Sequence, residues 1–267
     1  EIDFSAYTSV RDVVLTSTGS VDGFNGTNTA ISGGFFNIDA LTGSTSSDEL
    51  TGPNNSAHWS LNTANTQLTV NSNTLSFRSF ESLIGGSLVD TFAFNSTATF
   101  NGDLAGGLGA DGFEFSGYGS AVSLNLETMQ VPGLLSGTFA SIEAMTGSAF
   151  GDTLIGPNVG AAFNMTATGA GNVDNAFSFS SVEILNAGTG IDNLNYSGYN
   201  TAVTLDMQTS TTSGLTSFSG FELVTGSPFD DSIQANAAGS TFQMTSSGAG
   251  SVDGQPFTSF ENLLGGV

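Results

Sequence analysis

The feature that most constrains this chain is an internal repeat. An aromatic or aliphatic residue followed by an acid and a short apolar stretch recurs along the sequence, and each copy leads into a glycine-rich turn and an aspartate. The recurring acids are Asp39, Glu81, Glu143, Glu183, Glu222 and Glu261. The aspartates after the turns are Asp48, Asp90, Asp152, Asp192 and Asp231. Such a repeat predicts a fold that stacks copies of one small unit.

The spacing of the repeat indicates the size of that unit. Successive acids are mostly about 40 residues apart, and the one longer interval, from Glu81 to Glu143, contains an additional turn that ends at Asp111. A repeating unit of about 20 residues accounts for both intervals. A higher repeat of about 79 residues is also present, since 163–166 and 173–174 match 242–245 and 252–253.

The hydrophobic pattern predicts an all-β protein. Apolar residues alternate with polar ones, as in 121–126, and no segment shows helical spacing over three turns. A unit of about 20 residues cannot enclose a core alone, but stacked units bury a continuous one. We therefore predict a parallel β-solenoid (β-helix) of about 20-residue rungs, with a higher repeat of about 40 and about 79 residues, as a single continuous domain over 1–267. A string of immunoglobulin-like sandwiches is disfavoured because turns recur too often.

The alternation also predicts which side chains stack inside. The expected inward positions are Phe92, Phe94, Phe113, Phe115, Leu154, Phe163, Met165, Leu194, Tyr196, Phe242 and Met244. Trp59 aligns with Phe163 and Phe242, so we expect its side chain in the core and not stacked on a bound sugar.

The charge balance excludes several functions. With 24 acidic residues, two arginines and no lysine, the formal net charge is −22. Nucleic acids and anionic lipids need basic surfaces, so neither is an expected partner, whereas cations are. No apolar run is long enough for membrane insertion. The acids repeat instead of converging, and the one histidine, His58, aligns with alanine and threonine, so we expect no enzyme.

The aspartate turns carry a resemblance to a known family. The turns 85–90, 106–111 and 147–152 resemble the RTX nonapeptide, which the copy ending at Asp111 matches fully. The wider cassette is similar to haemagglutinin-like repeats of giant bacterial surface adhesins. The resemblance implies an extracellular or cell-surface structural protein, such as an adhesin rod or a filament of a biofilm matrix. A glycan- or cell-binding module of a larger repeat protein is the alternative.

The same resemblance implies calcium. Family sites hold the ion between successive turns, so the implied ligands are, first, Asp90 and Asp111, and then Asp152, Asp192 and Asp231. This sequence departs from the family because its turns are mostly about 40 residues apart, whereas family turns are in tandem. The other reading is turn chemistry alone, in which glycine provides positive φ and aspartate caps the turn. For the recurring acids we predict a structural role, accepting backbone N–H groups.

The two ends of the sequence are in register with the repeat. Residues 1–7 align with 193–199, and 265–267 align with 187–189. Two expectations follow: the chain continues into further repeats of a longer protein, or copies stack head to tail along the solenoid axis.

Overall fold

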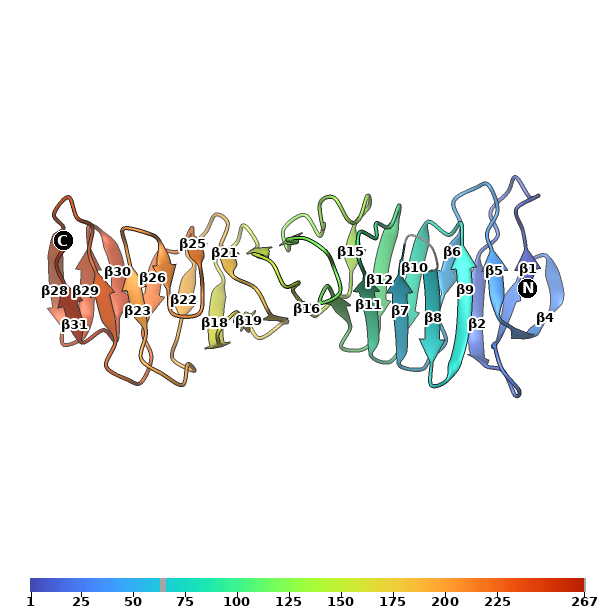
Figure 1. Cartoon of the computed structure of the whole chain (residues 1–267), viewed down its shortest axis with the longest axis horizontal. Helices are drawn as coiled ribbons and strands as arrows, with labels where there is room; N and C mark the ends of the chain where they lie inside the picture. Colours follow the sequence, from blue (N-terminus) through green and yellow to red (C-terminus); the bar gives the residue numbers. More distant parts are fainter. Residues whose placement is uncertain (63–65, 267) are drawn as a thin grey trace. The chain divides into compact units, whose positions relative to one another are not determined.

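The computed structural model describes residues 1–62 and 66–266, and it confirms an all-β fold. None of these residues is helical, and within them there is no helix that could cross a membrane. The chain divides into two compact units. Unit 1 comprises Glu1–Ser120 and Thr128–Ala149, and unit 2 comprises Ala121–Glu127 and Phe150–Val267. Both are built from stacked short strands (Figure 1), and each is described by itself.

Unit 1 consists of two sheets, and the chain passes repeatedly from one sheet to the other. Its strands are β1 (Ile2–Asp3), β2 (Val13–Thr18), β3 (Phe24–Asn28), β4 (Ile31–Ile38), β5 (Ala40–Thr42), β6 (Glu49–Thr51), β7 (Ala57–Leu61), β8 (Thr66–Val70), β9 (Asn73–Arg78), β10 (Ser82–Gly86), β11 (Asp90–Phe94), β12 (Asp103–Gly107), β13 (Gly112–Glu114), β15 (Phe139–Ala140) and β16 (Ala144–Thr146). One sheet has the order β1-β5-β9-β8-β7-β11-β13-β16, and the other has the order β15-β12-β10-β6-β2-β3-β4.

Unit 2 has the same construction. Its strands are β14 (Ser123–Asn125), β17 (Thr153–Ile155), β18 (Ala162–Ala167), β19 (Ala170–Val173), β20 (Phe177–Ser180), β21 (Ile184–Asn186), β22 (Asn193–Asn195), β23 (Thr204–Asp206), β24 (Thr211–Thr212), β25 (Ser217–Ser219), β26 (Leu223–Thr225), β27 (Ser232–Gln234), β28 (Phe242–Ser246), β29 (Ala249–Val252), β30 (Gln255–Thr258) and β31 (Asn262–Leu264). They form the ladder β20-β19-β18-β22-β26-β30-β29-β28 and two four-stranded sheets, β14-β17-β21-β25 and β24-β23-β27-β31.

Parallel pairing between successive rungs confirms the β-solenoid, but its rungs are longer than predicted. Leu154 lies beside Leu185 of the next rung, and the average spacing is roughly 32 residues. Within residues 1–62 and 66–266, the shorter rung that the sequence predicts is found once, where Phe92 lies beside Phe113. Hairpins account for part of the difference, because β7-β8-β9 and β18-β19-β20 place three antiparallel strands in one sheet within a single rung.

The sequence repeat is also not the structural rung. In each copy, the strand after the recurring acid and the strand after the aspartate lie in different sheets, as β21 and β22 do. The aspartate strand of one copy pairs with the acid strand of the next: β22 pairs with β26, and β27 with β31. One sequence repeat therefore covers a full turn of the solenoid, from the aspartate strand to the acid strand stacked on it, plus the corner that leads to the next aspartate strand. This geometry explains why the sequence period is longer than the rung.

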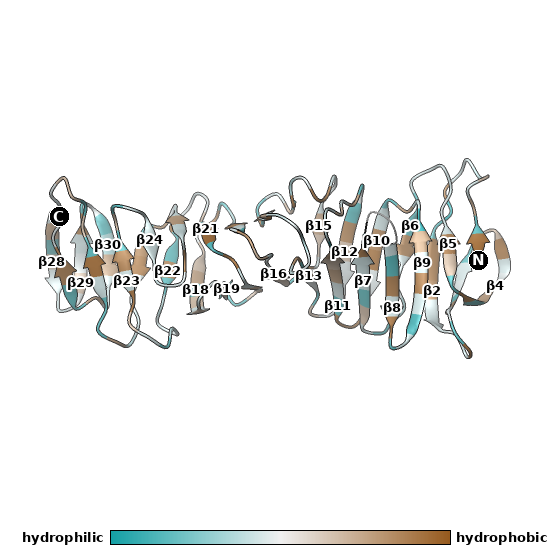
Figure 2. Ribbon diagram, viewed as in Figure 1, coloured by the Kyte–Doolittle hydropathy of each residue, from teal (hydrophilic) through white to brown (hydrophobic). Residues whose placement is uncertain are grey.

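The core is a set of stacked apolar side chains inside each unit, as the alternation predicts. Figure 2 shows that hydrophobic residues recur along the strands of both units. Trp59 is fully buried and stacks on Phe92, with ring centroids 5.5 Å apart. All the predicted inward residues are buried except two. Met244 is 50% exposed and Phe242 is partly exposed, because β28 is the last strand of its sheet among the described residues. The prediction of one continuous domain stays a prediction.

Candidate functional site: the buried aspartate turns

The predicted site residues are deeply buried. The carboxylates of Asp90, Asp111, Asp152, Asp192 and Asp231 are in residues with no exposed surface. Asp48, which the repeat contains but the predicted ligand set omits, is almost equally buried. Each of the six ends a glycine-rich turn and begins or precedes a strand. We call these six turns the aspartate turns. A buried carboxylate is costly unless it is hydrogen-bonded, so its partners decide its role.

Most of these carboxylates bridge two rungs. In five of the six turns, Oδ1 accepts a backbone N–H of the preceding rung at 2.6 to 2.7 Å. The donor–acceptor pairs are Arg11–Asp48, Asp90–Asp111, Val122–Asp152, Ala161–Asp192 and Val203–Asp231. The carboxylate thus continues the hydrogen-bond ladder around the corner between two sheets.

The recurring glutamates complete the arrangement from the following rung. Five backbone N–H groups of these aspartates donate to a glutamate Oε2 at 2.8 to 2.9 Å. The pairs are Asp48–Glu81, Asp111–Glu143, Asp152–Glu183, Asp192–Glu222 and Asp231–Glu261. In each pair the glutamate N–H donates in return to the aspartate carbonyl, at 2.8 to 3.2 Å. The predicted structural role of the acid is confirmed for these five, and it stays a prediction for Asp39.

The aspartate turns fall into two classes. Where serine follows the first glycine, its N–H and hydroxyl both donate to the carboxylate, as Ser44 does to Asp48 and Ser227 does to Asp231. In the second class a glycine with positive φ takes that place. These residues are Gly86 (φ 155°), Gly107 (101°) and Gly188 (99°), which precede Asp90, Asp111 and Asp192. In this class Oδ2 has no hydrogen-bond partner among the described residues.

The second class has perturbed acidity. Burial raises the pKa of Asp111 and of Asp192, and the nearby Glu143 and Glu222 carboxylates act in the same direction. Burial raises the pKa of Asp90 to about 7, and the Asp111 carboxylate adds to the effect. In such surroundings the neutral acid is favoured over the charged form.

Asp90 is the extreme case, because neither of its carboxylate oxygens has a partner among the described residues. The nearest donors, the Trp59 indole and the Ala57 N–H, lower its pKa only in part. Trp59 Nε1 makes no hydrogen bond of normal geometry within the same part of the chain, and the Ala57 N–H donates to the Val89 carbonyl at 3.2 Å. Asp90 and Asp111 occupy adjacent rungs, joined by the 2.7 Å bond from Asp90 N–H to Asp111 Oδ1. Two buried carboxyl groups therefore lie together, and three of their oxygen atoms have no hydrogen-bond partner in the part of the chain that the structure describes.

The fit to calcium differs between the turns. In the part of the chain described, no three histidine, cysteine or acidic side chains are grouped closely enough to hold a metal ion. At Asp231, N–H and O–H donors already point at both oxygens, which is the wrong polarity for a cation. Asp90 and Asp111 together have three carboxylate oxygens that make no hydrogen bond among the described residues, so they are the best candidate ligands. Calcium there stays a proposal.

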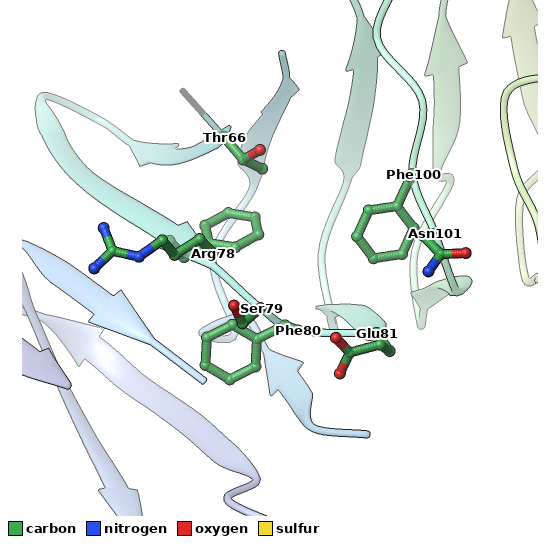
Figure 3. Close-up of a pocket in the computed structure, with 8 residues that line it drawn as sticks. Thr66, Arg78, Ser79, Phe80, Glu81, Phe100 and Asn101 are labelled. Atoms are coloured by element: carbon green, nitrogen blue, oxygen red, sulfur yellow. The ribbon is translucent and has the colours of Figure 1, made fainter. Parts of the chain in front are cut away.

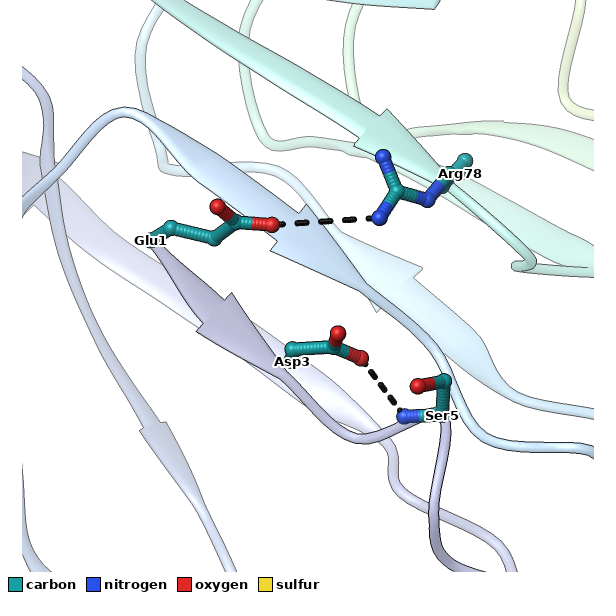
Figure 4. A network of polar contacts seen from close by, with 4 residues as sticks. All are labelled: Glu1, Asp3, Ser5 and Arg78. Atoms are coloured by element: carbon teal, nitrogen blue, oxygen red, sulfur yellow. Dashed lines mark hydrogen bonds and ion pairs between the residues drawn. The ribbon is translucent and has the colours of Figure 1, made fainter.

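The surface hollows of unit 1 were not predicted, and two of them have charged residues in their lining. One, of about 230 Å³, lies between Arg78, Glu81 and Phe100. The side chain of Arg78 points away from that of Glu81 (Figure 3). Arg78 instead pairs with Glu1 at 3.8 Å, in the open (Figure 4). The other, of about 430 Å³, is acidic. Its carboxylates come from Asp12, Asp48, Glu49, Glu81 and Asp103.

Comparison with known proteins found no matching family model, no similar curated protein and no similar solved structure.

Proposed function

We propose that this chain is a non-enzymatic structural protein, an extracellular β-solenoid of a bacterial surface adhesin or of a self-assembling surface or matrix filament. The observation that carries the proposal is the use of the buried acids. Asp192 and Glu222 hold neighbouring rungs together by backbone hydrogen bonds, and the same pair recurs in both units. A catalytic site needs acids that converge on one substrate. Here the hydrogen-bonded aspartate–glutamate pairs are distributed one per corner, which supports a structural scaffold.

The extracellular location rests on the RTX-like and adhesin-like repeats of the sequence. Antibodies raised against the chain and applied to intact source cells are expected to label the cell surface or a surrounding matrix. Labelling that appears only after permeabilisation would refute the location. A panel of polysaccharides incubated with the protein should release no new reducing ends, and any release above that of a heat-denatured sample would refute the non-enzymatic assignment.

The alternative is a glycan- or cell-binding module, and the smaller hollow in unit 1, of about 230 Å³, is the observation in its favour. Phe100 and Phe80 border it beside the polar groups of Asn101 and Arg78, which is a sugar-binding type of lining. A saturable glycan-array signal that disappears in Phe100→Ala would support this function. Trp59 is not a useful probe because it is fully buried.

Calcium stabilisation belongs to the same proposal, with Asp90 and Asp111 as the ligands. Adding calcium to the chelated protein should raise the unfolding midpoint of unit 1, by mass action on the folded state. The Asp90→Asn variant should lose most of that response, whereas Asp231→Asn, in a turn whose oxygens are occupied by donors, should keep it. Equal responses in both variants would place calcium elsewhere.

A further inference from the structure

A further hollow of unit 1 adjoins the one that contains Arg78. The hollow with Arg78, of about 230 Å³, is bordered on one side by Phe100 and Asn101. The further hollow, of about 290 Å³, is bordered by the same two residues. The rest of its lining consists of Thr99, Gly133, Leu134, Leu135 and Ser136. The two hollows therefore meet at Phe100 and Asn101, and we call them together the Phe100 groove.

The segment that separates the two hollows is held in place by the rung that follows it. Phe100 forms a parallel bridge with Leu135 of that rung. Its N–H donates to the Leu134 carbonyl at 2.7 Å, and its own carbonyl accepts the Ser136 N–H at 3.1 Å. Leu134 and Leu135 are each only 5% exposed. The stacking of the rungs thus fixes the backbone that carries the ring, which lowers the cost of ordering it around a ligand.

The ring of Phe100 is the accessible aromatic surface of the groove. Phe77 and Phe80, which line the same hollow, pack on each other with ring centroids 6.3 Å apart, and both are 5% exposed. Phe100 is instead partly exposed. Its ring is turned towards the segment that carries Arg78 and Phe80 (Figure 3). The groove therefore has an apolar surface that a ligand can cover.

The Asn101 amide adds an oriented hydrogen-bond donor. Ser136 Oγ donates to Asn101 Oδ1 at 2.7 Å, which occupies the oxygen side of the amide. Both side chains are exposed. Among the described residues Nδ2 of Asn101 makes no hydrogen bond, so it remains free to donate to a ligand. The Arg78 side chain, which is 68% exposed, provides further donors in the neighbouring hollow.

An apolar ring beside exposed donors matches the chemistry of a sugar. A pyranose has an apolar face of C–H groups and a rim of hydroxyl groups, and binding sites combine aromatic surface with a few oriented polar groups. Charge narrows the class. The described lining of the further hollow contains no charged residue, and that of the hollow with Arg78 contains one cation and one acid. A chain of net charge −22 repels uronates and sulfated glycans, so a neutral glycan fits best.

The size of the hollows sets the length of the ligand. Each is smaller than about 300 Å³, the lower end of ordinary ligand pockets, whereas the two together lie within that range. We propose that the Phe100 groove binds a neutral oligosaccharide with one sugar unit in each hollow, the apolar face of one unit on Phe100 and a hydroxyl accepting from Asn101 Nδ2. The inference rests on the glycan-binding alternative, for which it names the ligand class and the contacts.

The test measures glycan binding to the whole chain by isothermal titration calorimetry. The probes are neutral gluco-, manno- and galacto-oligosaccharides of increasing length, with oligogalacturonate as the charged counterpart. In at least one neutral series the affinity should rise at least about tenfold from the monosaccharide to the disaccharide, because the longer sugar fills both hollows. Oligogalacturonate of equal length should bind at least about tenfold more weakly at low salt.

Two variants each remove one contact. Phe100→Ala should weaken binding of the disaccharide at least about tenfold. Asn101→Asp keeps the oxygen that accepts the Ser136 hydroxyl but replaces the free donor by an acceptor, so it should weaken binding about fivefold to tenfold. If Phe100→Ala has a lower thermal midpoint than the wild type, Phe100→Leu, which keeps apolar volume at that corner, takes its place.

Matched controls change the same residue types elsewhere. Phe36→Ala removes a 69% exposed ring and Asn200→Asp changes an exposed amide, and both should bind like the wild type. No saturable binding in any neutral series, tighter binding of oligogalacturonate, or an equal loss in Phe36→Ala would overturn the inference. Monosaccharide binding that is lost in Phe100→Ala but does not strengthen with length would overturn the two-unit ligand and leave the glycan-binding function in place. Surface labelling of source cells tests the structural function independently of these outcomes.

Discussion

Replacing Asp90 by asparagine should stabilise unit 1 at neutral and alkaline pH. Asparagine keeps the shape of the side chain but cannot ionise. In the folded chain the pKa of Asp90 is raised from 3.8 to about 7, first by burial and then by the Asp111 carboxylate. Between these two values the folded state holds a proton that the unfolded state has released. The stability of the wild type therefore falls as the pH rises from about 4 to about 7 and levels off above, because the folded state binds more protons.

The magnitude follows from the size of the change. A carboxyl whose pKa rises from 3.8 to about 7 destabilises the folded state by up to about 4 kcal/mol once it is ionised. The indole of Trp59 and the N–H of Ala57 already lower the pKa in part, and the value of about 7 includes their effect. Relaxation and water penetration around an ionised buried carboxylate reduce the energetic cost below this upper limit. We expect Asp90→Asn to gain about 2 kcal/mol at about pH 8 and almost nothing at about pH 4.

The chain contains its own reporter for this measurement. Trp59 is the only tryptophan; it is fully buried and its strand pairs with that of Asp90. Urea unfolding followed by its fluorescence, in chelator at a series of pH values, gives the free energy of unfolding of unit 1. As a control, Asp231→Asn in unit 2 should leave this signal unchanged. If the wild type is as stable as Asp90→Asn at about pH 8, or becomes more stable from about pH 4 to about pH 7, the reasoning is wrong.

Three further predictions concern the rungs. Glu222→Ala removes the acceptor of the Asp192 N–H and should destabilise unit 2 by about 1 to 3 kcal/mol in chemical denaturation, whereas Glu222→Gln, which keeps an acceptor oxygen, should lose less. Gly106→Ala would place a Cβ 2.0 Å from the Ser141 carbonyl oxygen, so its thermal midpoint should fall well below that of the wild type, and an unchanged midpoint would refute the close approach. Phe92→Ala removes a buried ring and should destabilise unit 1 by about 3 to 5 kcal/mol by the same fluorescence assay.

Much of the fold could be read from local signals. Alternating apolar and polar residues, such as those of 121–126, predict strands, and repeated glycine-rich turns predict stacking of the units. Together they predicted the all-β class and the stacks of buried side chains. Trp59 was placed in the core because it aligns with Phe163, and both are fully buried. The rung length was not accessible in the same way. A sequence repeat gives the distance from one aspartate strand to the next, as from β22 to β27. Only the strand pairing shows that β22 stacks on β26, the strand that precedes β27.

The sequence by itself determined that six aspartates occupy equivalent turns, because the turn and the alternation recur around each, and the structure showed that all six are buried. Only the tertiary structure decided what each carboxylate meets there. Ser227 satisfies Asp231 from within its own turn, whereas Gly86 occupies that place before Asp90, whose carboxylate oxygens make no hydrogen bond among the described residues. Partners across rungs lie far apart in the chain, as Leu154 and Leu185 do, and the local sequence does not encode which groups stacking brings together.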